Sequence, residues 1–245
     1  MRGIPRLSVS PRGRASALAG LSVHDHLSPN FGPRRDGARI ELIVVHFTAM
    51  RSADEALERL CDPAHEVSAH YLIDARGLVL RLVPDTERAW HAGHGAWGGR
   101  GDVNSRSLGI ELANSGTAPF AAAQMDALEQ LLGGLLARHG LPPEAVIAHQ
   151  DMAPTRKTDP GPRFDWRRLA LGGLSIWPDA AEADPAGFYS DLTAFGYPDA
   201  PEAARLAAFR ARFRPRHDGP VDAVDAGMAR DLATRFPVDR SDATA

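Results

Sequence analysis

The chain of 245 residues contains one cysteine, Cys61, and one lysine, Lys157, although lysine and arginine together number 28. A single cysteine excludes an intramolecular disulfide and gives no sign of an oxidising compartment. It also argues against a structural zinc site, which needs four protein ligands and usually takes cysteines. Because every other basic residue is an arginine, the compact and rotatable ammonium of Lys157 stands out in this chain.

Long hydrophobic runs and an excess of one charge are missing as well. No stretch approaches the ~20 apolar residues that a bilayer-spanning helix needs. A formal net charge of −3 gives no electrostatic argument for nucleic acid as the main partner. Hydrophobic residues at 44% are typical of a soluble globular protein, and the length allows one full domain and a small second one.

The N-terminal region differs in composition from the rest. Residues 1–37 are rich in proline, glycine, serine and arginine, which predicts an irregular N-terminal arm. Residues 15–21 resemble the apolar part of a signal peptide. Serine and glycine interrupt this segment, however, and no lipidatable cysteine follows it, so the pattern argues against export.

Strand-like and helix-like patterns alternate between residues 38 and 178. Apolar or alternating runs predict strands at residues 40–45, 67–73, 78–83, 107–113 and 145–148, and apolar residues at helical spacing predict helices at 52–61, 121–139 and 166–171. This alternation predicts a mixed α/β domain over residues 38–178. Three further amphipathic runs, residues 188–195, 202–213 and 222–236, predict a small helical bundle as a second domain over 186–238.

One stretch, residues 149–161, gathers polar chemistry in a predicted loop broken by prolines and a glycine. It begins with His149 and contains Asp159, while His46 ends an earlier apolar run. Two imidazoles and one carboxylate form a common catalytic zinc set, because three protein ligands leave the fourth tetrahedral position for water. Spacing alone leaves an alternative open, in which both histidines are ordinary buried side chains and Asp159 caps the turn before Pro160.

Two further residues suit a hydrolytic site. Glu111 lies in the middle of an apolar strand, where a buried charge is costly without a partner or a function, and it could act as general base and then as acid. Lys157 is close to Asp159 in sequence, and its ammonium could stabilise an oxyanion. A solvent-facing Glu111 and a surface Lys157 are the alternatives.

Five ordered motifs carry a family resemblance over residues 28–178. They are Val44–Thr48, Ser68–Asp74, Ala89–Gly93, Ser107–Glu111, and His149 together with Lys157–Gly161. In these motifs the chain resembles the zinc N-acetylmuramoyl-L-alanine amidases, which are related to bacteriophage T7 lysozyme and to peptidoglycan recognition proteins. The branch of the 1,6-anhydromuramoyl-L-alanine amidases is the most similar, because the last ligand position holds Asp159 and not a cysteine.

The resemblance implies an α/β fold with a central mixed β-sheet flanked by helices. It also implies one Zn²⁺ per chain and cleavage of the amide between N-acetylmuramic acid and L-alanine. Carried over residue by residue, it implies zinc ligation by His46, His149 and Asp159. It also implies that Glu111 is the catalytic acid/base and that Lys157 stabilises the transition state. The partners would then be peptidoglycan fragments in cell-wall turnover or recycling.

Contacts with the sugar or the peptide are expected from four residues, and the C-terminal helices have a resemblance of their own. The expected substrate-binding residues are His91, Trp97, Asn104 and Arg106. Residues 186–238 resemble a three-helix peptidoglycan-binding domain, although Arg210 stands where glutamine is common. We expect a cytoplasmic protein, with a periplasmic or wall-associated one as the alternative. Competing functions are a zinc peptidase that cuts within the stem peptide and a binding or sensing module without catalysis.

Overall fold

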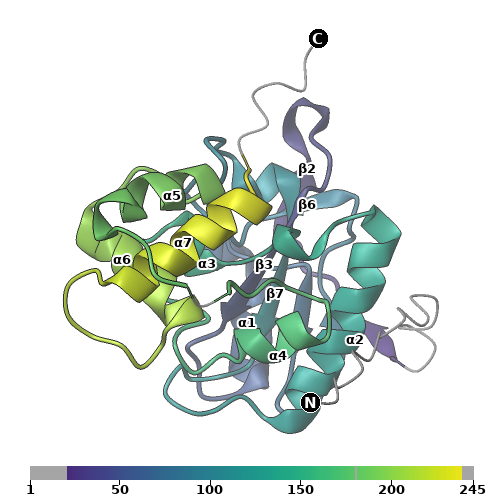
Figure 1. Ribbon diagram of the computed structural model, residues 1–245. Helices are drawn as coiled ribbons and strands as arrows, with labels where there is room; N and C mark the ends of the chain where they lie inside the picture. The colour runs from purple at the N-terminus through teal and green to yellow at the C-terminus, as the bar shows by residue number, and fades with distance from the viewer. Residues whose placement is uncertain (1–20, 180, 239–245) are drawn as a thin grey trace, which may run out of the picture.

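A computed structural model describes residues 21–179 and 181–238 of the chain (Figure 1). Its centre is a six-stranded sheet in the order β1-β5-β4-β7-β3-β8, beside a two-stranded sheet of β2 and β6. The strands are β1 (Val23–Asp25), β2 (Phe31–Pro33), β3 (Leu42–Phe47), β4 (Tyr71–Ile73), β5 (Val79–Arg81), β6 (Glu87–Ala89), β7 (Ser107–Leu112) and β8 (Val146–Ala148).

Helices cover both faces of this sheet. They are α1 (Ala53–Cys61), α2 (Ala122–His139), α3 (His149–Met152), α4 (Trp166–Leu171), α5 (Phe188–Phe195), α6 (Glu202–Phe213) and α7 (Ala223–Arg235). Figure 1 shows α5, α6 and α7 gathered on one side of β3 and β7, with α2 on the opposite side. Within the described ranges, each helix is too short or too polar to span a bilayer.

Parallel pairing brings three strand ends to one edge of the sheet. β3 pairs in parallel with β7 on one side and with β8 on the other, and the register places His46 opposite Glu111. Because parallel strands run in the same direction, their carboxyl ends meet at one edge, where α/β proteins commonly bind ligands. His46, Glu111 and the residue that follows β8, His149, therefore lie at this edge.

The alternation of side chains along β3 decides which face carries chemistry. Ile43 and Val45 pack in a core with α2, whereas Leu42 and Val44 pack in a core with α5, α6 and α7. Since successive side chains of a strand point to opposite faces, His46 lies on the face of Leu42 and Val44. The histidine thus faces the side covered by the C-terminal helices.

The neighbouring strands follow the same rule. In β7, Leu108 and Ile110 pack toward α2, so Glu111 lies on the other face, next to His46. In β8, Ile147 packs in the core shared with the C-terminal helices. His149 follows two residues later and lies on the same face of the sheet as Ile147. Strand alternation therefore brings the three polar side chains to one face of the sheet.

The C-terminal helices share a hydrophobic core with the sheet. Phe188, Phe209 and Leu232, one from each of the three helices, belong to the same buried cluster as Trp97 and Ile147. The two units expected from composition are thus joined through a continuous core. The apolar faces of α5, α6 and α7 are buried against the sheet and not only against one another.

Most expected elements are confirmed, several of them by their caps. Ser52 caps α1 and its hydroxyl accepts a hydrogen bond from the backbone N–H of Glu55. α2 ends at Gly140, whose φ of 63° is the left-handed conformation expected of a C-terminal glycine. The turn at residues 74–77 joins β4 and β5 as an antiparallel pair, with Gly77 at positive φ.

Three local expectations are wrong. Residues 21–37 are not irregular throughout, because β1 pairs in parallel with β5 and β2 pairs with β6. The strand expected at residues 67–73 is reduced to β4. Residues 149–152 form the short helix α3 and not a loop. Residues 1–20, with most of the segment that resembles a signal peptide, lie outside the described residues.

Candidate active site

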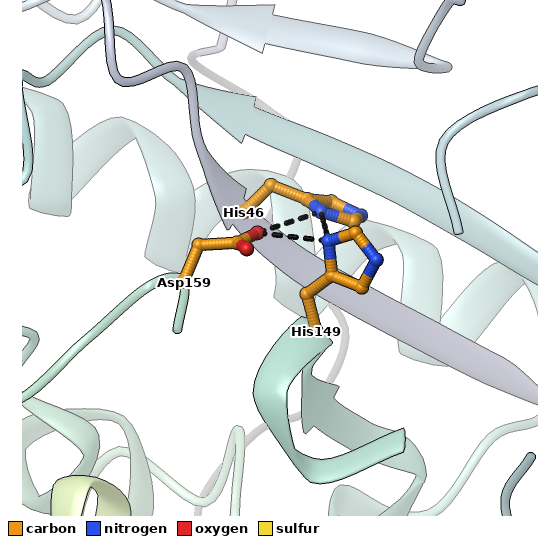
Figure 2. A group of neighbouring side chains, drawn as sticks. All are labelled: His46, His149 and Asp159. Carbon is orange, nitrogen blue, oxygen red and sulfur yellow. Dashed lines mark hydrogen bonds and ion pairs between the residues drawn. The ribbon is translucent and has the colours of Figure 1, made fainter. Parts of the chain in front are cut away.

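Three side chains converge at the sheet edge (Figure 2). The Nδ1 atoms of His46 and His149 lie 2.8 Å apart, and each lies 3.0 Å from Oδ2 of Asp159. His46 ends β3, His149 begins α3, and Asp159 comes from the loop that follows α3. All three residues are buried. The structure therefore brings together the three ligands that the sequence predicted.

A chain of hydrogen bonds assigns the tautomer of His46. The Ser107 hydroxyl donates to the Val103 carbonyl at 2.5 Å, so Ser107 Oγ can only accept from Nε2 of His91, 3.1 Å away. Burial, followed by the neighbouring His46, holds the pKa of His91 well below its usual value, so the ring is neutral and its Nδ1 is an acceptor. Nε2 of His46, 3.0 Å away, must then carry a proton and donate it.

Burial and hydrogen bonding also assign which ring nitrogen carries the lone pair in both candidate ligand histidines. Burial, followed by the neighbouring His149, lowers the pKa of His46 to about 4, so its ring is neutral at pH 7 and Nδ1 has a free lone pair. Nε2 of His149 donates to the Ala92 carbonyl at 3.0 Å, which assigns the tautomer with its lone pair on Nδ1. Both imidazoles therefore present lone pairs toward a carboxylate oxygen.

This set of donor atoms fits a metal cation. Three acceptor atoms within 3.0 Å of one another repel unless a positive charge lies between them. In tetrahedral zinc sites with bonds of about 2.0–2.1 Å, the ligand atoms lie ~3.3 Å apart, close to the separations found here.

A second cluster that could hold a metal is already neutralised. His217, Asp222 and Asp225 also bring ligand atoms together within the described residues. Arg210 pairs with Asp225, and Arg214 pairs with both aspartates. These guanidinium groups neutralise the two carboxylates, which leaves little negative charge to attract a metal cation. Of these two clusters in the described part of the chain, the one around His46 combines lone pairs with full burial.

Glu111 lies beside the three ligands in a setting that favours its neutral form. Burial of the carboxyl group, followed by the negative charge of Asp159, raises the pKa of Glu111 to about 8. Its Oε2 is buried and has no hydrogen-bond partner among the described residues. A cation bound at the ligands would offset the charge of Asp159 and lower the pKa of Glu111 toward 7. A pKa near the working pH suits a general base.

The raised pKa predicts a stability effect in the metal-free protein. The pKa of Glu111 is raised from 4.5 to about 8, so ionisation costs stability as pH rises through that window. We expect Glu111→Gln, which resembles the neutral carboxyl, to raise the free energy of unfolding at pH 9 on the order of 2 kcal/mol. Urea unfolding in the presence of a chelator measures this. The difference should vanish near pH 4.5, and a pH-independent difference would contradict the assignment.

The site opens into a cleft of about 380 Å³. Glu111, Lys157 and His91 line it together with the ligands His149 and Asp159. The positive charge of Lys157 acts to lower the pKa of both Glu111 and His46, which places its ammonium within electrostatic reach of the centre. A substrate carbonyl in the cleft would thus lie between the metal ligands and a cation.

Three expected substrate contacts lie outside this cleft. Trp97 is buried and packs edge-on against Phe195 and Tyr197. The Asn104 side chain accepts hydrogen bonds from the backbone N–H groups of residues 91 and 92, and Arg106 donates to the Trp97 carbonyl at 3.0 Å. These three residues are not among those that line the cleft, so a direct contact with substrate stays a prediction.

The remaining histidines of the motifs have supporting positions. His91 lines the cleft and also bonds to His46, so its position serves the metal site. A Cβ on Gly109 would lie 2.4 Å from the His91 ring, which explains why β7 carries a glycine there. His70 accepts from the Gly109 N–H through Nδ1 and bonds to the Glu87 carbonyl through Nε2, as expected for a buried structural histidine.

Sequence reasoning missed two residues that hold the site. Arg156, next to Lys157, donates to the carbonyls of Ala92 and His94 at 2.6 Å and so fixes the loop against His149. Asp151 is buried in α3 and bonds to the backbone N–H of Ala148. Arg156 could have been found from its place beside Lys157. Asp151 had no local signal, because its side-chain partners, Arg212 and Tyr197, come from distant parts of the chain.

Comparison with known protein families agrees with this geometry. The family model for N-acetylmuramoyl-L-alanine amidase matches residues 36–162, a range that holds the three ligands, Glu111 and Lys157. The chain belongs to this family. The amidase hydrolyses the amide bond between N-acetylmuramic acid and the L-alanine of peptidoglycan fragments. The resemblance inferred from the five motifs is thereby confirmed.

Relatives of this amidase match over both parts of the chain. AmiD of Escherichia coli K12 is 38% identical in an alignment of 237 positions, which covers 82% of this chain and 85% of AmiD. The structure of E. coli AmiD in complex with the substrate anhydro-N-acetylmuramic acid-L-Ala-D-gamma-Glu-L-Lys has a TM-score of 0.75 and 34% identity, covering 86% and 93% of the two chains. AmpDh3 from Pseudomonas aeruginosa, in complex with anhydromuramic pentapeptide, has a TM-score of 0.74 and 28% identity, covering 86% and 96%. The predicted α/β fold with C-terminal helices is confirmed.

Proposed function

We propose that the amidase is a zinc enzyme with one Zn²⁺ held by His46, His149 and Asp159. The observation that carries this is the convergence of two imidazole lone pairs and one carboxylate oxygen at 2.8–3.0 Å, with Glu111 on the adjacent strand. Three protein ligands are typical of catalytic zinc, because the fourth position stays available. Zinc bound there would polarise the substrate carbonyl and lower the pKa of a water molecule.

The residues of the chain divide the proton and charge transfers between them. Glu111 takes the proton from the attacking water, and it later gives that proton to the amine of L-alanine as the amide bond breaks. Lys157, on the cleft wall, stabilises the negative charge that develops on the carbonyl oxygen. His91 keeps His46 in the tautomer whose Nδ1 faces the metal site.

Replacing Lys157 by methionine is expected to lower kcat about 100-fold with little change in KM, because an oxyanion contact acts mainly in the transition state. Steady-state hydrolysis of a muramoyl-L-alanine peptide by the zinc-loaded protein measures both constants. Arg163→Met, at an exposed position in the same loop, is the control and should keep the parent kcat. A Lys157→Met enzyme with the parent kcat would remove Lys157 from the mechanism.

We propose 1,6-anhydromuropeptides as the preferred substrate class. The support is the pair of related structures, AmiD and AmpDh3, whose bound ligands are anhydromuramic peptides. Hydrolysis of soluble anhydromuropeptides should be compared with release from purified sacculi, using one preparation of zinc-loaded protein. Faster release from sacculi would contradict this preference.

The products of this hydrolysis also distinguish an amidase from a zinc peptidase that cuts within the stem peptide. An amidase leaves a free L-alanine amine and an intact lactyl group, whereas a zinc peptidase would leave part of the stem peptide on the sugar. Mass spectrometry of the products therefore identifies the bond that breaks. The cytoplasmic location expected from the sequence stays a prediction, which fractionation of cells expressing the full chain would test.

A further inference from the structure

The helix that begins with the ligand His149 is held by the C-terminal helices. α3 has only four residues, His149–Met152, and all four are buried. A helix of one turn has little stability of its own, so its position depends on tertiary contacts. The geometry of His149 is therefore set by whatever fixes α3.

Asp151 is the centre of these contacts. Its Oδ2 accepts a hydrogen bond from the Ala148 N–H at 2.9 Å, which fixes the residue before His149. The same oxygen receives Nη1 of Arg212 at 2.6 Å, and Oδ1 receives the hydroxyl of Tyr197 at 2.8 Å. The side chains of Asp151 and Arg212 are both fully buried. One carboxylate thus links the start of α3 to two residues of the C-terminal region.

Further contacts extend this network on both sides. Arg212 also donates to the carbonyl of Val146 in β8 at 3.0 Å, and its guanidinium lies 4.4 Å from the centre of the Trp166 ring. The side-chain amide of Gln150 donates to the Ala208 carbonyl in α6. The backbone N–H of Gln150 bonds to the Asp159 carbonyl at 3.0 Å, so α3 is also tied to the third ligand.

We propose that the Asp151–Arg212–Tyr197 network positions His149 for the metal, which makes the C-terminal helices part of the amidase centre. This inference rests on the proposed zinc site. In it, Asp151, Arg212 and Tyr197 are positioning residues, because they act through the backbone of α3 and do not touch the ligand atoms. Residues that orient a metal ligand in this way commonly change metal affinity 10–100-fold when they are replaced.

A matched pair of variants separates positioning from general stability. Asp151→Asn removes the charge that receives Arg212. Asp225→Asn removes the partner of another buried arginine, Arg210, in the same helical region but away from α3. Zinc affinity is measured by competition with a chromophoric chelator, and ligand geometry by the absorption spectrum of the Co²⁺-substituted protein. Thermal unfolding followed by circular dichroism gives a temperature at which each variant is folded, and zinc binding is measured there.

Folded Asp151→Asn is expected to bind zinc about tenfold more weakly than the parent and to show a shifted Co²⁺ spectrum. Asp225→Asn should stay within about twofold of the parent affinity. If Asp151→Asn does not fold, Tyr197→Phe is used in its place and is expected to bind zinc about threefold more weakly than the parent. Its control is Tyr189→Phe, which changes a partly exposed tyrosine of α5 and should keep the parent zinc affinity. Parent affinity and spectrum in the folded Asp151→Asn or, failing that, in Tyr197→Phe would overturn the proposal.

Zinc binding by the parent chain distinguishes a failure of the proposed zinc site from a failure of the positioning network. A parent that binds zinc and hydrolyses its substrate, together with variants that bind zinc equally well, would overturn the positioning network alone. A parent that binds no zinc would reject the proposed metal site, and the positioning inference would fall with it.

Discussion

Glu111→Gln should lower kcat for the muramoyl-L-alanine amide by about 10³-fold, the range expected when a general acid/base is lost. The glutamine amide is similar in shape to the carboxyl group, so it fits the same place in β7. It cannot take a proton from water or return one to the leaving amine. Zinc content should stay near one per chain, because the ligand atoms come from His46, His149 and Asp159.

The measurement pairs single-turnover hydrolysis with metal analysis of the same sample. Glu58→Gln, at an exposed position of α1, is the control for removing one carboxylate and should keep the parent rate. Activity above a tenth of the parent value in Glu111→Gln would show that another group carries the proton. The same variant is expected to stabilise the metal-free protein at high pH, so Glu111 lowers stability where it serves catalysis.

Ending the chain after Trp177 should leave no soluble amidase. This deletion removes α5, α6 and α7, and it uncovers Trp97, Ile147 and Met152 on the sheet side of the shared core. Each large apolar side chain contributes about 1.5–3 kcal/mol by burial, so exposing several of them can exceed the ~5–15 kcal/mol stability of a typical domain. Loss of Arg212 would in addition leave the Asp151 carboxylate without its buried partner.

Fractionation of lysates followed by size-exclusion chromatography measures the outcome. A chain ended after Val238 is the control, since it keeps all three helices and should remain soluble. A truncated chain that is monomeric, folded and able to bind zinc would show that residues 186–238 form a dispensable domain. Binding of these helices to the cell wall stays a separate prediction, which cosedimentation of the full chain with sacculi would test.

Much of the fold could be predicted because local patterns and tertiary packing agree. The helices α4, α5 and α6 have the bounds expected from apolar spacing, and Ser52 and Gly140 cap α1 and α2. β1 and β2 could not be found, because three-residue strands in a region rich in proline and glycine have no distinctive period. They exist through pairing with β5 and β6, and their partners lie more than 50 residues away.

The expected substrate contacts lie away from the cleft for a related reason. Trp97, Asn104 and Arg106 have the side chains that bind sugars and peptides, and they lie in a glycine-rich loop before Glu111. Residue type and loop location do not give the direction of a side chain. In the structure the loop turns these groups inward, where they support His91 and the contact with the C-terminal helices.

By itself the sequence determined the chemistry of this amidase. Through the resemblance to the zinc amidases, the sequence predicts His46, His149 and Asp159 as metal ligands, Glu111 as the proton carrier and Lys157 as the stabilising cation. Only the tertiary structure decided which nitrogen atoms face the metal and what holds them there. The tautomers depend on hydrogen bonds from His91 and the Ala92 carbonyl, and the position of α3 depends on Arg212 and Tyr197. Such contacts join residues far apart in the chain, so the spacing of residues along it carries no trace of them.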